Sequence, residues 1–196
     1  MHTPHLETRR GALTQALGLA AAGGLLVQGF RADAAAGPVS EGPASDWAWL
    51  TGSWKVRHRR LKSRLTGSTE WQEFDGTCVN WPLMGGAANV DDNVIALPAG
   101  DYHGVSVRCF NPETRKWGIW WIDSRYARME PPVWGEFKDG VGTFMGADTH
   151  NGIAVTAMFR WSAITATTAH WEQAFSTDGG KSWESNWHMD FTRVSA

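Results

Sequence analysis

Short runs of residues that alternate between apolar and polar extend over most of the chain after residue 45. Because successive side chains of a β-strand point to opposite faces, this alternation predicts strands, whereas no later stretch keeps a convincing helical period. Turn signals separate the runs, and they include the Asp-Gly and Asn-Gly pairs that favour tight hairpins. The pattern predicts ten strands, near residues 53–61, 69–80, 87–97, 102–110, 116–123, 132–137, 142–147, 153–162, 168–176 and 184–193.

Ten strands joined by short turns predict an all-β fold, an antiparallel up-and-down β-barrel. Closing the sheet removes both exposed edges, and a barrel of this size leaves room for a small ligand. An open two-sheet sandwich is the alternative. The formal net charge of -2 argues against a nucleic-acid partner, which would require a basic surface.

The N-terminus has the layout of an export signal. Arg9 and Arg10 precede an apolar stretch over residues 12–30, and alanines follow at 34–36. The paired arginines fit twin-arginine export, with an ordinary secretory signal as the alternative. We therefore expect a periplasmic or secreted protein with no stable membrane span after processing. The expected segments are a signal peptide at 1–36, a linker at 37–45 and a barrel domain at 46–196.

The first expected strand carries polar groups on the face that should point inward. Its apolar face also bears His58 and Arg60, and polar groups inside an apolar interior indicate a ligand cavity rather than a filled core. The two faces are Trp54, Val56, His58 and Arg60 on the inside, and Lys55, Arg57 and Arg59 on the outside.

The same parity argument selects inward residues on later strands. The chain contains 13 tryptophans, whose large rings suit a core or a site for flat, lipophilic molecules. In the last strand Trp187 should face inward and Asn186 outward, although a bulge would reverse the faces beyond it. The expected ligand-binding residues are His58, Arg60, Glu73, Asn89, Asp91, Trp121, Asp123, Gln173 and Trp187.

Three of these residues are also candidates for acid/base chemistry: His58, Glu73 and Asp91. A histidine paired with a carboxylate can move protons near neutral pH, so a His58–Glu73 couple is a reasonable prediction. Asp91 belongs to a polar face with Asn89 and Asn93, which could instead be a solvated or structural network. An isolated inward histidine can likewise be a hydrogen-bonded structural residue.

Two motifs resemble known families. Gly52-x-Trp54 at the first strand, with Arg193 in the last, resembles the lipocalin or calycin barrels, in which the tryptophan closes the barrel base and an arginine packs across it. The segments Asn89–Asn93 and Trp171–Ser176 are similar to an exported bacterial lipocalin-like family of unknown function, so this resemblance implies a fold and no activity. Residues 176–183 resemble an Asp-box, which implies a structural turn at Asp178.

The spacing of the cysteines and the absence of several sequence motifs exclude some kinds of site. Cys78 and Cys109 should lie two strands apart, too far for a disulfide, so we expect two free thiols. The chain has no zinc motif, no P-loop and no Gly-x-Ser-x-Gly elbow, and no metal site is predicted.

The sequence therefore favours an exported lipocalin-like protein that binds a small apolar or aromatic molecule in the barrel. One alternative is an enzyme that uses acid/base chemistry on a lipophilic metabolite. The other is a haem-binding barrel with His58 or another histidine as ligand, as in barrels related to nitrobindin; no other cofactor is predicted. The sequence identifies neither the ligand nor the oligomeric state.

Overall fold

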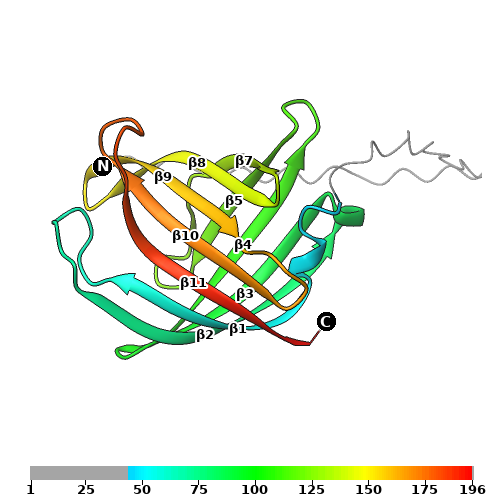
Figure 1. Cartoon of the computed structure of the whole chain (residues 1–196), viewed down its shortest axis with the longest axis horizontal. Helices are drawn as coiled ribbons and strands as arrows, with labels where there is room; N and C mark the ends of the chain where they lie inside the picture. Colours follow the sequence, from blue (N-terminus) through cyan, green and yellow to red (C-terminus); the bar gives the residue numbers. More distant parts are fainter. Residues whose placement is uncertain (1–43, 196) are drawn as a thin grey trace, which may run out of the picture. The chain divides into compact units, whose positions relative to one another are not determined.

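The computed structural model describes residues 44–195, so the expected signal peptide and most of the linker lie outside the described residues. The elements, coloured along the sequence in Figure 1, are η1 (Ala48–Leu50), β1 (Gly52–Leu61), β2 (Trp71–Leu83), η2 (Met84–Gly86), β3 (Ala88–Leu97), β4 (Gly100–Asn111), β5 (Lys116–Asp123), β6 (Arg128–Met129), β7 (Val133–Lys138), β8 (Val141–His150), β9 (Ile153–Ser162), β10 (Thr168–Ser176) and β11 (Glu184–Ser195).

These strands close into a ring. Neighbours along the chain pair antiparallel, β5 pairs with both β4 and β7, and β1 pairs with β11 to complete the circle. The two-residue β6 only extends the edge of β5, so ten strands form the barrel. The predicted closed antiparallel lipocalin-like barrel is confirmed, with strand bounds that differ by a few residues and one short extra strand.

Two hairpins show how local sequence sets the register. The pair Asp139-Gly140 has φ of 53° and 77°, and Asn151-Gly152 has φ of 50° and 81°. Positive φ at both central residues is the type I′ geometry, whose twist matches that of the flanking strands. These two turns fix the pairing of β7 with β8 and of β8 with β9.

Trp54 and Arg193 close one end of the barrel as the resemblance implied. The Trp54 indole donates a hydrogen bond to the Leu50 carbonyl at 2.7 Å, and the Arg193 guanidinium lies 4.1 Å from the Trp54 ring centre. Arg193 also donates to the backbone carbonyls of Thr51 and Ala166, both at 2.6 Å. This cation thus satisfies carbonyls that would otherwise lack partners at the barrel base.

The short turn before β1 completes this closed end. Trp47 is buried against aromatic rings of β5, β7, β8 and β9, namely Trp117, Phe137, Phe144 and Trp161. The turn is a 3₁₀ helix that begins after Trp47, and neither Ser45 nor Asp46 caps it by a side chain. The Asp46 carboxylate instead accepts a hydrogen bond from the Trp117 indole at 3.0 Å.

The Asp-box segment forms a tight turn between β10 and β11. The Asp178 carboxylate accepts hydrogen bonds from the Ser182 hydroxyl at 2.6 Å and from the backbone N–H groups of Lys181 and Ser182 at 2.9 Å. These bonds, those from Ser182 foremost, lower the pKa of Asp178. Its structural role agrees with the resemblance.

The outward placement of Asn186 was wrong. Gln173 pairs with Trp187 and Ala174 with Ser185, so Asn186 is the extra residue of a β-bulge. Its side chain is 0% exposed and accepts a hydrogen bond from the Gln173 amide at 2.8 Å. The face of Trp187, Met189 and Phe191 is inward as predicted.

Cys78 and Cys109 are free, as expected; Cys78 is buried and Cys109 half-buried. Within residues 44–195, no helix has the length and apolar character needed to cross a membrane.

Candidate functional site: a cavity inside the barrel

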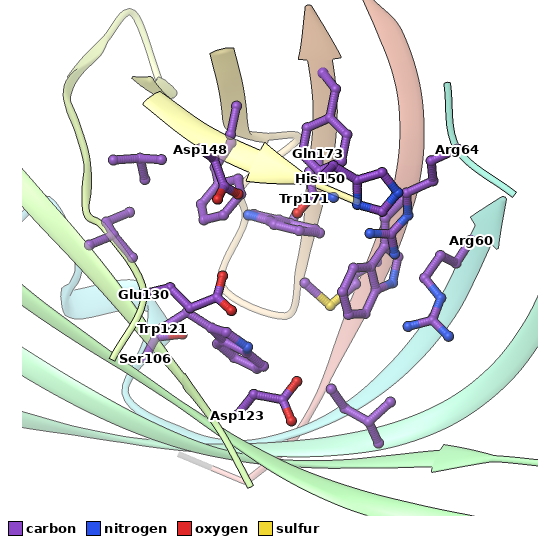
Figure 2. A pocket seen from close by; sticks show the side chains of 18 of the residues that line it. Arg60, Arg64, Ser106, Trp121, Asp123, Glu130, Asp148, His150, Trp171 and Gln173 are labelled. Carbon is purple, nitrogen blue, oxygen red and sulfur yellow. The ribbon is translucent and has the colours of Figure 1, made fainter. Parts of the chain in front are cut away.

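The barrel encloses a cavity of about 700 Å³. This volume lies within the range of about 300–1,000 Å³ that is usual for small-molecule sites. Figure 2 shows side chains converging on it from several strands and from the loops that carry Arg64 and Glu130. Polar and charged side chains share its wall with aromatic ones, which are Tyr102, Trp121, Tyr126, Phe159, Trp161, Trp171, Phe175, Trp187 and Phe191.

A buried ion pair forms part of the cavity floor. The Arg108 guanidinium donates to the Asp91 carboxylate at 2.5 Å and to the Asn89 side-chain oxygen at 3.0 Å. Asp91 also accepts from the Ser106 backbone N–H at 3.0 Å and from the Asn93 amide at 2.6 Å. The polar face of β3 is therefore a buried network rather than a solvated strand face.

One side of the cavity carries carboxylates, contributed by Asp123, Glu130 and Asp148 (Figure 2). Arg125 binds Asp123 with two guanidinium nitrogens, at 2.9 and 2.5 Å. Burial alone would raise the pKa of Asp123, but the hydrogen bonds from Arg125 lower it. Burial raises the pKa of Glu130, and the nearby negative charge of Asp148 adds to the effect.

Arg60 and Arg64 lie across the cavity from Glu130 and Asp148 (Figure 2). The Arg60 guanidinium lies 5.1 Å from the Trp187 ring centre, and the Arg64 guanidinium lies 5.7 Å from the same ring. Burial, and secondarily repulsion by Arg60, lowers the pKa of Arg64 to about 10. The Arg64 guanidinium therefore remains charged near neutral pH.

The β1–β2 loop, residues 62–70, brings Arg64 to this position. The backbone N–H of Leu65 donates to both carboxylate oxygens of Glu184, each at 2.9 Å. The loop ends are joined by a hydrogen bond from the Lys62 N–H to the Glu70 carbonyl at 2.9 Å. Glu184 begins β11, the strand that pairs with β1 in the ring, and its carboxylate thus holds the loop where the Arg64 side chain lines the cavity.

His58 faces inward as predicted but lies behind the cavity wall. It is 2% exposed, stacks on Phe74 at 4.8 Å, and its Nδ1 accepts a hydrogen bond from the Trp187 indole at 3.2 Å. Its Nε2 lies so close to Gly76 that a Cβ there would be 2.6 Å away. Burial, with a contribution from Arg60, lowers the pKa of His58 to about 3.

These contacts make His58 a support for Trp187 and do not fit the other predicted roles. One ring nitrogen is occupied by the indole and the other faces the backbone, so the residue does not fit axial ligation of haem. A histidine that stays neutral well below neutral pH is also a poor general base.

The inward placement of Glu73 was wrong. Glu73 forms an ion pair with Arg57 at 2.8 Å, with 54% of its side chain exposed, and it pairs in register with Arg59 rather than His58. Phe74 takes the inward position that the acid/base couple would have needed. The His58–Glu73 pair is therefore not assembled.

Most of the other predicted residues line the cavity: Arg60, Asp91, Trp121, Asp123, Gln173 and Trp187. Asn89 lies beneath the floor, in contact with Arg108. The prediction missed several polar lining residues: Arg64, Tyr102, Ser106, Arg108, Arg125, Glu130, Asp148 and His150. Parity along β4 could have found Tyr102, Ser106 and Arg108, which share one face, whereas the loop residues carry no such signal.

A second polar cluster lies outside the barrel on β10 and β11. Ser185 contacts His188 at 3.0 Å, His188 contacts His170 at 3.3 Å, and His170 contacts Asp190 at 2.7 Å. None of these four residues lines the cavity. In the part of the chain that the structure describes, no three histidine, cysteine or acidic side chains are grouped to hold a metal ion.

Comparison with known proteins gives a fold and no family. No family model matches the chain, and no curated protein matches it. Among solved structures it is similar to the S-type phycobiliprotein lyase CPES from Guillardia theta, with a TM-score of 0.51 and 11% identity over 78% of this chain and 92% of the other. A redesigned β-barrel matches with a TM-score of 0.43 and 12% identity over 79% of this chain and 96% of its own. The likeness to the lyase supports the lipocalin-like barrel fold alone.

Proposed function

We propose that this protein is exported and binds a small apolar or aromatic molecule inside its barrel. The observation that carries the proposal is the cavity of about 700 Å³, whose wall combines aromatic rings with polar and charged side chains. Several of its polar groups are fixed by hydrogen bonds, as Asp91 is by Arg108 and Ser106. Aromatic surface for contact area, together with polar groups held in place to fix orientation, suits a small-molecule site.

The energetics of such a complex are favourable. Each 100 Å² of apolar ligand surface removed from water contributes about 2.5 kcal/mol. Micromolar affinity needs about 8 kcal/mol after the cost of association is met. With an association cost of about 4 kcal/mol, the low end of its range, the apolar term must supply about 12 kcal/mol, which corresponds to roughly 480 Å² of buried ligand surface. A ligand with several aromatic rings approaches this area, and the surrounding indoles can stack on it.

The export part of the proposal has separate support. Arg9 and Arg10, the apolar stretch that follows and the alanines at 34–36 lie outside the described residues, and they have the order of a twin-arginine signal. A periplasmic or secreted location gives the binding protein access to molecules outside the cytoplasm. Cell fractionation with an Arg9→Lys/Arg10→Lys variant tests this part: the variant should stay in the cytoplasm.

Binding can be tested with the neutral fluorescent probe N-phenyl-1-naphthylamine. Ala157 is 2% exposed and lines the cavity, whereas Ala154, on the other face of β9, is exposed. We expect the probe to bind to the wild type and to show energy transfer from tryptophan. The variant Ala157→Trp should weaken binding at least about tenfold, because the new side chain fills the hollow. The variant Ala154→Trp should leave the affinity for the probe unchanged. No binding to the wild type, or equal effects of the two variants, would contradict the proposal.

A further inference from the structure

The cationic side chains of the cavity differ in how they are neutralised. Three arginines that line it have a carboxylate partner: Arg108 with Asp91 at 2.5 Å, Arg125 with Asp123 at 2.5 Å, and Arg128 with Glu130 at 3.9 Å. Arg60 and Arg64 form no ion pair within residues 44–195. Two guanidinium groups without an ion-pair partner among these residues thus face the same part of the hollow, and the more distant Glu184 carboxylate attracts Arg64 only secondarily.

The surroundings of this pair are apolar. The Arg60 guanidinium lies 5.2 Å from the Phe74 ring centre, and the Arg64 guanidinium lies 5.9 Å from the ring centre of Phe175 on β10. Both approach Trp187, at 5.1 and 5.7 Å. Aromatic faces offset only part of the cost of removing a cation from water. An anion placed between the two guanidinium groups would reduce both this cost and their mutual repulsion.

The fold holds Arg64 in place although it lies in a loop. Glu184 fixes the Leu65 backbone N–H with both carboxylate oxygens, so the guanidinium one residue earlier is directed toward the cavity. Neighbouring His150 does not add a third positive charge near neutral pH, because burial and the charge of Arg64 lower its pKa. The cations of the cavity wall that lack an ion-pair partner within residues 44–195 are therefore Arg60 and Arg64.

We propose that the cavity ligand is an aromatic carboxylate whose carboxylate group binds between Arg60 and Arg64 while its rings pack against Trp187 and Phe175. The guanidinium fork matches the planar geometry of a carboxylate. Glu130 and Asp148, across the cavity, repel an anion and so favour the orientation in which the ligand's carboxylate points away from them. This inference rests on the proposed binding function and adds the chemical class of the ligand.

A matched pair of probes tests the inference: 1-pyrenebutyric acid and its neutral methyl ester, each followed by energy transfer from tryptophan. We expect the wild-type protein to bind the acid about tenfold or more tightly than the ester. The variant Arg60→Gln/Arg64→Gln should lose this preference through weaker binding of the acid, with ester affinity retained. Retained ester binding shows that the variant barrel is folded.

The control removes the same charge from the outside of β1. Lys55 and Arg59 are exposed and point away from the cavity, so Lys55→Gln/Arg59→Gln should keep the preference for the acid. Equal affinities of the wild type for acid and ester, or equal loss in both double variants, would overturn the inference. Binding of N-phenyl-1-naphthylamine without a preference for the acid overturns only this inference, whereas failure of all three probes overturns the binding function as well.

Discussion

The ion pair between Asp91 and Arg108 provides a quantitative test of the barrel interior. The two residues are 2% and 3% exposed, and their charged atoms are 2.5 Å apart. Replacing Asp91 by Asn leaves the Arg108 guanidinium buried without an opposite charge. Removing one partner of such a pair costs about 3–5 kcal/mol in the free energy of unfolding. An Asn amide keeps only one oxygen, so it loses either the acceptor of Arg108 or the acceptor that Ser106 and Asn93 share.

Urea unfolding of Asp91→Asn, followed by tryptophan fluorescence, measures this cost. The neighbouring Asp92→Asn is the control, because the Asp92 side chain is 50% exposed and lies 3.7 Å from an exposed histidine, His103. We expect the control to lose less than about 1 kcal/mol. The double variant Asp91→Asn/Arg108→Met should be more stable than Asp91→Asn alone, because the unpaired charge is gone. Equal losses in Asp91→Asn and Asp92→Asn would refute the buried-pair argument.

Two further predictions concern His58 and the loop anchor. The pKa of His58 is about 3 in the folded protein, against 6.5 for an ordinary histidine. Between these two pH values the unfolded chain therefore binds more protons than the folded protein. Because of this, the free energy of unfolding falls as the pH is lowered through this range. Between pH 7.5 and 5, we expect the free energy of unfolding of the wild type to fall by about 2 kcal/mol more than that of His58→Gln, measured by urea titration; equal slopes would contradict the buried neutral histidine. Glu184→Ala removes both acceptors of the Leu65 N–H. We expect trypsin to cleave the β1–β2 loop of this variant, after Lys62 or Arg64, faster than it cleaves the same loop in the control Glu136→Ala. Glu136 is an exposed residue on β7. Equal cleavage rates would show that Glu184 does not hold the loop.

Much of the barrel could be predicted because the alternation of apolar and polar residues within each strand shows which side chains face inward and which face outward. Alternation placed Trp54 and His58 inward on β1, and turn pairs such as Asn151-Gly152 marked where strands reverse. Ring closure followed from the number of strands and the need to cover both edges. These features depend on local sequence and on general rules of sheet formation.

The errors arose where a contact depends on the relative position of two strands or on a loop. Glu73 was placed inward because nothing local showed that Phe74, one residue later, faces the core. The bulge at Asn186 exists only in the pairing of β10 with β11. Arg64 reaches the cavity because Glu184, far along the chain, holds its loop, and no pattern in either segment reveals the other.

The central claim, that a hollow lined by indoles accepts a ligand, is tested most directly by the indole N–H signals in a ¹H–¹⁵N NMR titration with N-phenyl-1-naphthylamine. Single Trp→Phe variants would assign the signals. We predict that the signals of Trp121, Trp171 and Trp187, which line the cavity, shift on binding. Those of Trp81 and Trp134, exposed on the outside at 49% and 38%, should stay in place. Shifts confined to Trp81 and Trp134, or no shifts at all, would contradict the account.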